Sequence, residues 1–342
     1  MKNPPSFLSR LSRVLALGCG ACAALPAVVH AQSSVNIYGL MDIGLGYYRG
    51  GGVNQSRVDS GQDAPSRLGF KGSEDLGDGL SAVFKLEAGL AADTGSGTGT
   101  GGTFAFNRES WVGLAGGFGR VVLGRVWSVT DDAWSVHRFT NFSAYIFPEF
   151  GNFDRTYTNA IKYNSPSWGG FDVSGVYSLG ESSNGVQRGR AAELGVKYSD
   201  GPLSVWGSFS ETHNLTSPDA DKLAVLAGSY LVGPILFRAS YMDSKPKATG
   251  LANARLWLLG GNYGFAPLWT IGADYMRRTV QDSDKGNGVT RVLLNYELSK
   301  RTGVYAYAAR LTNRGGDTES FSGRVTPGAS QGGINVGLRQ SF

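Results

Sequence analysis

Charged side chains recur at regular spacing in segments that are otherwise apolar. Arg67, Lys71 and Lys85 each stand next to large apolar residues, and Arg108 comes shortly before the apolar stretch 111–114. Fixed charges on the wall of a narrow water passage orient polar solutes and disfavour apolar ones, which lose water there without replacement contacts. Arginine suits such a wall because it stays charged at any relevant pH and is more weakly hydrated than lysine. The alternative is that each base only neutralises a carboxylate or binds loop carbonyls.

Residues that could support catalysis are few. Beyond the first 31 residues the chain has two histidines, His137 and His213. Asp131, Asp132 and Ser135 lie near His137 in the sequence, but a loop histidine is more often solvated than part of a triad. The sequence contains no HExxH motif and no phosphate-binding Gly-Lys-Ser/Thr loop. We therefore predict no enzyme activity, no cofactor and no metal site.

Residues 1–31 have the character of a secretory signal. Three basic residues come first, followed by an apolar run from 14 to 29. Both cysteines, Cys19 and Cys22, lie in this segment, so the mature chain would have no thiol for a disulfide, a metal or a nucleophile. The alternative is a lipoprotein signal with lipid attached to one of them. We predict that the signal is cleaved and that residues 32–342 form a single domain.

Composition narrows the class of the mature chain. Its net charge is about +2, because the +5 of the full chain includes three basic and no acidic residues from the signal. Nucleic-acid binding would require clustered Lys and Arg on one face, so no nucleic-acid partner is predicted. No later stretch approaches eighteen consecutive apolar residues, which excludes helical membrane spans. No segment shows a convincing helical periodicity.

Short segments alternate between apolar and polar residues with a period of two. In the first, Val35, Ile37, Ile43 and Leu45 share one parity, while Asp42 and several glycines hold the other. This pattern predicts strands with one apolar and one polar face. A soluble sandwich buries its apolar face, whereas a membrane barrel turns that face to lipid and keeps its inside wet. Lys, Arg and Asp on the polar faces favour the barrel, and a soluble binding sandwich is the alternative.

The connections between segments alternate in length. Short turns such as 116–119, 200–202 and 232–234 alternate with long polar or glycine-rich gaps such as 49–65 and 313–331. Short turns at one rim and long loops at the other are typical of outer-membrane barrels. The sequence thus predicts an all-β fold, a sixteen-stranded antiparallel transmembrane β-barrel with an aqueous channel, whose last strand pairs with the first. The predicted strands are 34–48, 66–74, 80–91, 104–115, 119–127, 156–165, 169–180, 189–199, 203–212, 222–232, 234–243, 254–265, 267–279, 288–298, 302–312 and 332–342.

One irregular stretch, residues 127–155, interrupts this array and contains the sequence PEFG at 148–151. Its many aromatic residues argue against disorder, and a lumen gives its backbone a polar environment that lipid denies. We therefore predict that this third long loop folds into the pore and narrows it; a surface excursion is the alternative. Two other stretches, 223–226 and 256–259, are apolar on both faces, which indicates either protomer contacts or a dry lumen wall.

Several stretches resemble the general-diffusion porins of Gram-negative outer membranes, particularly the beta-proteobacterial branch. They are VNIYG at 35–39, SRLGFKGSEDLG at 66–77, PEFG at 148–151 and the terminal Phe342. The resemblance covers nearly the whole mature chain, and its second motif is highly specific. It implies export through the periplasm to the cell outer membrane and a homotrimer whose third long loop folds into each pore. It also implies that loop 92–103 latches onto a neighbouring protomer and that the terminal phenylalanine is an assembly signal read by the barrel-assembly machinery.

In this family, arginines on the barrel wall face carboxylates on the inserted loop. Carried over by motif, the wall residues are Arg67 and Arg108, the loop acid is Glu149, and Arg155 is a third base. Arg155 shares parity with residues that should face lipid, so without a β-bulge its side chain would point the wrong way. Lys162 is in phase with the lumen and is the alternative. The predicted pore-lining residues are Lys71, Lys85, Asp154 and Lys162.

The predicted function is passive diffusion of small hydrophilic solutes and ions through a water-filled channel with a transverse charge constriction. Acids near the loop keep the constriction from being uniformly basic, so the predicted selectivity leans only slightly toward anions. A substrate-specific channel for anions, organic acids or sugars is the alternative, in which aromatic loop residues would form a stacking track for sugars. Outer-membrane lipids and lipopolysaccharide are the expected surroundings of the barrel.

Overall fold

The computed structural model describes residues 34–132, 156–180, 189–213, 219–248 and 251–342. The chain divides into two compact units, Met1–Gln32 and Ser33–Phe342. The predicted signal segment, residues 1–31, lies outside the described residues, so the fold described below is that of the second unit. None of the helices in the described ranges is long and apolar enough to cross a membrane.

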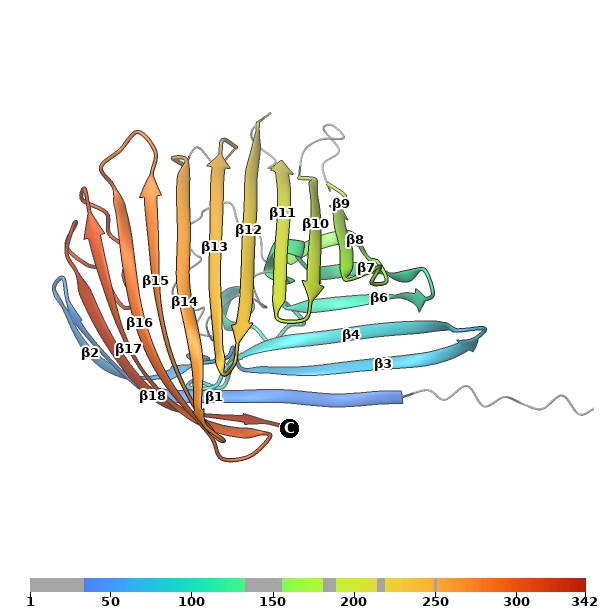
Figure 1. Cartoon of the computed structure of the whole chain (residues 1–342), viewed down its shortest axis with the longest axis horizontal. Helices are drawn as coiled ribbons and strands as arrows, with labels where there is room; N and C mark the ends of the chain where they lie inside the picture. The colour runs from blue at the N-terminus through green and yellow to red at the C-terminus, as the bar shows by residue number, and fades with distance from the viewer. Residues whose placement is uncertain (1–33, 133–155, 181–188, 214–218, 249–250) are drawn as a thin grey trace, which may run out of the picture. The chain divides into compact units, whose positions relative to one another are not determined.

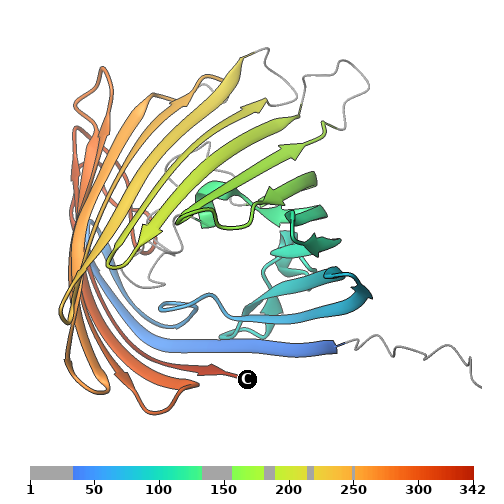
Figure 2. The same ribbon diagram turned by 45° about the vertical axis from the view of Figure 1, so that its right-hand side comes forward.

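The second unit is built almost entirely of antiparallel strands joined edge to edge (Figures 1 and 2). The chain closes on itself because β1 pairs with β18 over Leu40–Arg49 and Gly332–Ser341. The short β5 and the 3₁₀ helix η1 lie between β4 and β6, and β2 and β3 pair with successive parts of β1. The eighteen strands of the described residues therefore form sixteen strands of wall, which confirms the predicted barrel. The elements are β1 (Ser34–Gly50), β2 (Val53–Ser60), β3 (Arg67–Gly77), β4 (Leu80–Ala91), β5 (Ser96–Gly97), η1 (Thr100–Gly102), β6 (Glu109–Gly116), β7 (Gly119–Trp127), β8 (Thr156–Asn164), β9 (Phe171–Ser178), β10 (Ala191–Asp200), β11 (Leu203–His213), β12 (Ala220–Val232), β13 (Ile235–Pro246), β14 (Ala254–Ala266), β15 (Trp269–Val280), β16 (Gly286–Glu297), β17 (Thr302–Arg314) and β18 (Gln331–Ser341).

The two faces of the wall differ as the period-two pattern predicts. Leu45 and Leu226 are among the many large apolar residues exposed on the outside, at 70% and 58%. Asp42, which has the opposite parity on β1, is fully buried on the inside. Only an apolar solvent tolerates such an outer surface, because water would drive these side chains into a core. The apolar face is therefore the lipid face, and the polar face lines the lumen.

Aromatic pairs mark the rim at which the short turns lie. The ring centroids of Phe171 and Tyr198 are 4.6 Å apart, and those of Trp269 and Tyr296 are 4.5 Å apart. All four are on the outward face at strand ends beside short turns. Tyr and Trp favour the membrane interface because one side of the ring is apolar and the other carries a polar group. The pairs place this rim at one boundary of the lipid layer.

The prediction of a long loop over residues 49–65 is wrong. β1 continues to Gly50, a tight turn follows, and β2 runs back from Val53 to Ser60. Gly50, Gly51 and Gly52 all have positive φ, which residues with a Cβ rarely adopt. β2 was missed because its sequence, VNQSRVDS, is polar on both faces and shows no apolar alternation.

Residues 61–66, between β2 and β3, leave the wall and turn toward the lumen. The carboxylate of Asp42 accepts hydrogen bonds from the backbone N–H groups of Asp63 and Ala64, at 2.8 and 2.5 Å. It also accepts one from the Tyr305 hydroxyl at 2.7 Å. Arg339 binds the carboxylate of Asp63 at 2.6 Å. These contacts tie the interrupted second wall strand to the seam at which the barrel closes.

The stretches that are apolar on both faces belong to a dry part of the lumen wall. Val225 pairs with Met242, which pairs with Leu256, and the band continues through Leu258 on the same face of β14. On the next strands it runs through Met276, Val289 and Leu311 in direct register. All of these side chains are buried, whereas their neighbours Leu226 and Leu259 are exposed on the outer face. Of the two alternatives, the dry lumen wall is the correct one for the inward residues.

The lipid-facing assignment predicts a specific loss of stability. Leu226→Arg places a charge in the middle of the outer face of β12, and we expect it to reduce the free energy of unfolding by about 2–4 kcal/mol. Urea unfolding of the protein refolded in lipid vesicles measures this change. The control Leu226→Met keeps the volume and should cost less than about 1.5 kcal/mol. Equal stability of the Arg and Met variants would contradict the assignment.

Candidate pore constriction

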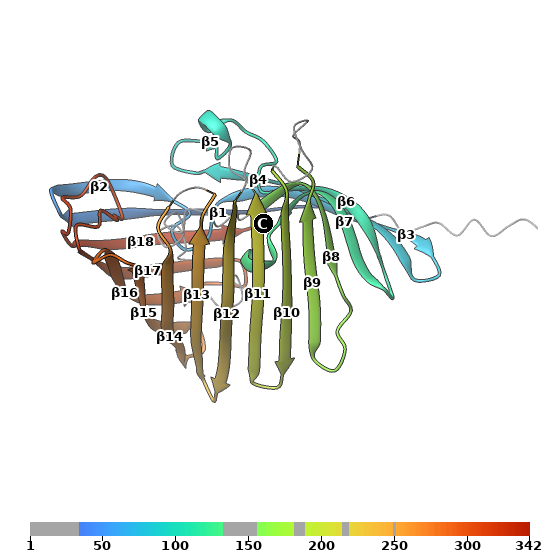
Figure 3. The same ribbon diagram turned by 90° about the horizontal axis from the view of Figure 1, so that it is seen from above.

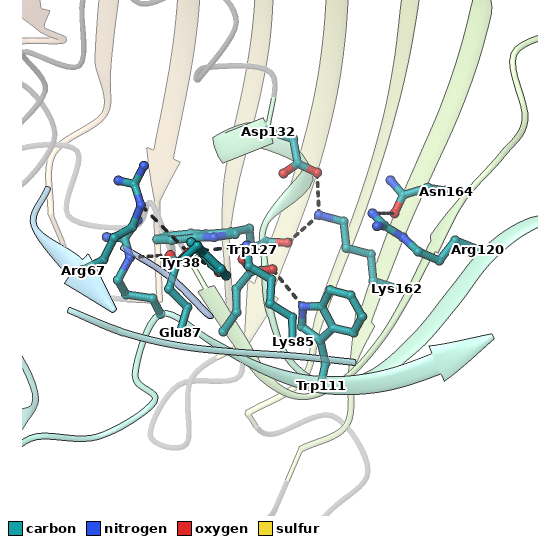
Figure 4. A network of polar contacts seen from close by, with 12 residues as sticks. Tyr38, Arg67, Lys85, Glu87, Trp111, Arg120, Trp127, Asp132, Lys162 and Asn164 are labelled. Atoms are coloured by element: carbon teal, nitrogen blue, oxygen red, sulfur yellow. Dashed lines mark hydrogen bonds and ion pairs between the residues drawn. The ribbon is translucent and has the colours of Figure 1, made fainter. Parts of the chain in front are cut away.

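Most of the predicted basic residues of the described chain gather on β3 and β4 and directly before β6, which are adjacent in the wall. One cross-strand row contains Lys71, Lys85 and Trp111, and the row beside it contains Gly69, Glu87 and Glu109 in direct register. Residues two apart on one strand share a face, so both rows point into the lumen. Figure 4 shows the side chains of this wall converging on one polar network.

Glu87 is the centre of the network. Its carboxylate accepts hydrogen bonds from the Tyr38 hydroxyl at 2.7 Å and from Arg108 Nε at 2.6 Å. Lys85 Nζ lies 3.6 Å and Arg67 Nε 3.9 Å from the same group. The Glu87 side chain is only 4% exposed, while those of Arg67, Lys85 and Arg108 are 27%, 24% and 16% exposed. The acid is therefore beneath the bases, and the bases form the surface.

A second acid and several aromatic rings hold the bases in place. Glu109 accepts a hydrogen bond from Trp111 Nε1 at 2.8 Å and is in contact with Lys85 Nζ. The guanidinium of Arg108 lies 4.8 Å from the centroid of the Trp127 ring, and this cation–π contact restricts its position. Lys71 stands similarly over the ring of Tyr38, at 5.3 Å. Bases fixed in this way present their charge without needing to reorganise when a solute arrives.

The third long loop leaves the wall inside the barrel. Residues 129–132 form a helical turn, and Glu193 on β10 accepts hydrogen bonds from the N–H groups of Val129 and Thr130, at 2.8 and 2.7 Å. A carboxylate is favourable there because the N–H groups at the start of a helical turn have no intrahelical partners. The Thr130 hydroxyl is 2.8 Å from that of Ser208, also on the inner face. The described start of the loop is thus fastened to the lumen wall.

Lys162 faces the lumen as its parity predicts, but it is committed to the loop. Its ammonium group donates a hydrogen bond to the Trp127 carbonyl at 2.8 Å and contacts the Asp132 carboxylate. Its side chain is 7% exposed. Lys162 therefore anchors the start of the loop to β8 and presents little charge to the open lumen.

A β-bulge interrupts β8. Without a bulge, the predicted inward direction of the Arg155 side chain would not fit the alternation of the strand. Gly124 on β7 pairs with Ala160, but Val126 pairs with Tyr157, so β8 contains one extra residue. Asn159 lies in that step and has a φ of 49°. The bulge puts Tyr157 and Ala160 on the same buried face, although their numbers differ in parity. The alternation on the loop side of the bulge is therefore shifted by one residue.

The structure brings part of the predicted site together. Arg67, Lys71 and Lys85 line one cavity of about 660 Å³, and Arg108 borders it through Glu87. Arg120, which was not predicted, lines the same cavity and lies 5.6 Å from the Trp111 ring. Glu87 and Glu109 were also not predicted, although their parity with Lys85 and Trp111 was a visible signal. The predicted residues Glu149, Asp154 and Arg155 lie outside the described residues.

Metal ligation has no basis in the described ranges of the chain, where no group of three His, Asp, Glu or Cys side chains is suitably arranged. His213 lies 3.0 Å from Glu211, on the strand β11, and His137 is outside the described residues.

Comparisons with known proteins support the barrel fold. Residues 18–316 match a family model described as Gram-negative porin. Outer membrane porin protein 32 of Delftia acidovorans is 29% identical over 353 residues, covering 94% of this chain and 98% of that protein. Major outer membrane protein P.IB of Neisseria gonorrhoeae is 35% identical over 330 residues, covering 84% of this chain and 91% of that protein. The solved structure of an anion-selective porin from Comamonas acidovorans has a TM-score of 0.81 at 27% identity, covering 91% of this chain and 100% of that chain.

The contact of Glu193 with the start of the loop can be tested by hydrogen exchange. Glu193→Gln removes the charge that accepts two backbone N–H groups, so the amides of Val129 and Thr130 should exchange about tenfold faster or more. Mass spectrometry of a peptide covering residues 128–132 measures this rate. The control Glu211→Gln removes a carboxylate that pairs with Lys222 on the outer face and should leave the rate unchanged. Equal rates in the two variants would show that Glu193 does not hold the loop.

Proposed function

Because this chain belongs to the Gram-negative porin family and is an outer-membrane channel protein, we propose that a transverse charge constriction controls passive diffusion through its lumen. The solutes are small, hydrophilic molecules and ions. One side of the constriction is formed by the bases of β3 and β4 together with Arg108, which directly precedes β6, and a slight preference for anions results. Since the named relatives are porins, we propose no catalytic activity.

The observation that carries this proposal is the layering of charge on the wall. Arg67, Lys85 and Arg108 are several times more exposed than Glu87, the acid that holds them. A solute in the lumen therefore meets cations first, and the carboxylate below is partly screened by them. The low dielectric of the wall strengthens this field compared with bulk water. The similarity to an anion-selective porin supports the same direction of selectivity.

We place the opposite side of the constriction on the third long loop, with Glu149 as its acid and Asp154 as a lining residue. The start of this loop, at Val129 and Thr130, is fastened inside the barrel, which supports an inward course. Arg155 is proposed as the third base, because the bulge at Asn159 supplies the shift in alternation that it needs. Lys162 is assigned to anchoring the loop.

A substrate-specific channel is the second candidate function. Tyr38, Trp111 and Trp127 line the cavity together with the bases, and aromatic rings beside charges can bind sugars or organic anions. In this structure the same rings lie against Arg108, Lys71 and Arg120. Their contacts with the bases are sufficient to explain why aromatic residues occur in this cavity. Saturable block of conductance by one solute would favour a specific channel, and conductance that rises linearly with salt would favour general diffusion.

The wall arginines can be tested by ion selectivity. In planar bilayers with a salt gradient, the double variant Arg67→Ser, Arg108→Ser should shift the reversal potential toward cations, because two exposed positive charges leave the constriction. Glu87→Gln should shift it toward anions, since the acid beneath is removed. The matched control Lys222→Ser, Arg255→Ser removes two bases from the outer face and should have no effect. If the lumen and outer-face variants behave alike, the arginines are not part of the constriction.

We further propose that the protein is a homotrimer and that loop 92–103 is its latch. This loop turns back onto the strand before it, since the Thr98 N–H donates a hydrogen bond to the Gly89 carbonyl at 3.0 Å and β5 pairs with the end of β4. Figure 3 shows β5 standing out beyond the wall that carries β4. The exposed ring of Phe104 follows directly. A compact projection of this kind suits insertion into a neighbouring protomer.

Deleting residues 93–102 should weaken the trimer and spare the channel. We expect the trimer band in unheated SDS electrophoresis to disappear at a lower temperature than that of the unchanged protein, while single-channel conductance persists. Deleting residues 180–189 from another long loop removes the same number of residues and is the control. Unchanged thermal behaviour of the trimer after the first deletion would remove the loop from the interface.

The two ends of the chain have separate proposed roles. We propose that residues 1–31 are removed and that residues 32–342 form the mature barrel domain. Phe342 exchanges backbone hydrogen bonds with Gly39, at 3.0 and 3.1 Å, and its ring is about half exposed on the outer face. An exposed terminal aromatic residue at the closing seam is well placed to be the assembly signal read by the barrel-assembly machinery.

A further inference from the structure

A hollow of about 350 Å³ lies at the long-loop ends of β15, β16 and β17, which run side by side in Figure 1. Its lining includes Arg277, Arg310 and Arg314. These residues have the parity of the exposed Ile271 and Val292, so they are on the outer, lipid-facing side of the wall. The long-loop rim of an outer-membrane barrel is its extracellular rim. The hollow is therefore level with the headgroups of the outer leaflet.

Two glycines on the central strand make the hollow. Gly286 pairs with Arg314, and Gly288 pairs with both Arg277 and Thr312. Neither glycine has a side chain to fill the space between β15 and β17, which lie two strand spacings, roughly 10 Å, apart. A Cβ at Gly288 would lie 2.8 Å from the Tyr275 hydroxyl oxygen, so the ring of Tyr275 leans over this position. The result is a pocket with arginines on both sides and a hydroxyl at its edge.

The basic residues of the hollow outnumber the acids within the part of the chain that the structure describes. Across the described ranges, no ion pair involves Arg277, Arg310, Arg314 or Lys285, and the lining contains a single acid, Asp284. Two other bases on the same outer rim are paired: Lys222 lies 3.3 Å from Glu211, and Arg255 lies 3.4 Å from Asp243. Arg278, which also borders the hollow, pairs with Asp317 at 3.1 Å. The cluster thus has charge available for an external anion.

Apolar surface continues from the hollow toward the middle of the membrane. Val292 and Ile271 are 45% and 41% exposed on the same face, and the Trp257 ring lies 5.2 Å from that of Tyr275. A ligand that matches this surface has an anionic head and hydrocarbon chains. Guanidinium groups bind phosphate through paired hydrogen bonds, and basic residues near a membrane surface attract anionic lipid. A free anion would leave the apolar part of the surface unused.

We propose that this hollow is a binding site for the phosphorylated headgroup of lipopolysaccharide. Arg277 approaches the phosphate from β15, and Arg310 and Arg314 approach it from β17. Lys285 in the loop above adds a fourth positive charge, and the acyl chains lie along Val292 and Ile271. The site is on the outside of the barrel and is independent of the lumen wall that governs conduction.

The test uses full-length mature protein refolded in detergent and lipopolysaccharide added as micelles. The triple variant Arg277→Gln, Arg310→Gln, Arg314→Gln should bind it on the order of 100-fold more weakly in a titration, because each lost charge should weaken binding roughly fivefold. The control Lys222→Gln, Lys245→Gln, Arg255→Gln removes three bases from the same rim and should change the affinity less than threefold. Single-channel conductance should be the same in all three proteins, which also verifies that each is folded.

Three further results would overturn the proposal. One is a loss of affinity in the control variant as large as in the arginine variant, which would indicate nonspecific charge attraction. Another is equal binding of lipopolysaccharide whose phosphates have been removed enzymatically. The third is displacement of bound lipopolysaccharide by inorganic phosphate at constant ionic strength, which would assign the cluster to a free anion.

Discussion

The structure depends on one constraint: in hydrocarbon, every backbone N–H and C=O must find a partner within the protein. A strand meets this constraint only between two neighbours, so the sheet must close. Closure is made where β1 pairs with β18, and it is completed by the backbone bonds between Gly39 and Phe342. The Asp42 carboxylate lies at this seam and binds Tyr305 and the backbone of Asp63 and Ala64. The same carboxylate therefore lies where the barrel closes and also holds the connection between β2 and β3, which together form the second wall strand.

Closure also decides where chemistry can occur. The side chains of one parity are apolar and face lipid. Charged side chains are therefore confined to the other parity and to the two rims. On the inner face, Glu87 holds Arg67, Lys85 and Arg108 without covering them. On the outer face, charged residues appear where the strands leave the hydrocarbon, as Arg277 and Arg310 do. The same alternation therefore produces two basic surfaces with different partners, one facing water in the lumen and one facing lipid headgroups.

The architecture could be predicted from sequence because the period-two pattern records which solvent each face meets. The pattern missed β2, a strand that is polar on both faces, and along β12 and β14, where both faces are apolar, it predicted the strands but left the role of the apolar stretches open. It could not place Glu87 at the centre of the site, because parity gives a face but not the partners of a side chain. It also could not locate the bulge at Asn159, since a single residue in the left-handed region leaves no mark on the apolar pattern. Long-range contacts, such as Glu193 with the loop start, are decided by the closed wall and not by nearby sequence.

The distribution of exposed charge explains why the field in the lumen should be one-sided. Another charge pair on the inner face is closed off: Arg291 and Asp274 bind each other and are 4% and 0% exposed. Across β12 to β17 the extracellular part of the inner wall is the buried apolar band, which contributes no charge. Among the described residues, the accessible bases of this wall are thus those of β3 and β4, Arg108 before β6 and Arg120 on β7, and low-dielectric protein behind them directs their field into the water. Few arginines are enough to produce this field, because the neighbouring side chains are paired, buried or apolar and add little opposing charge.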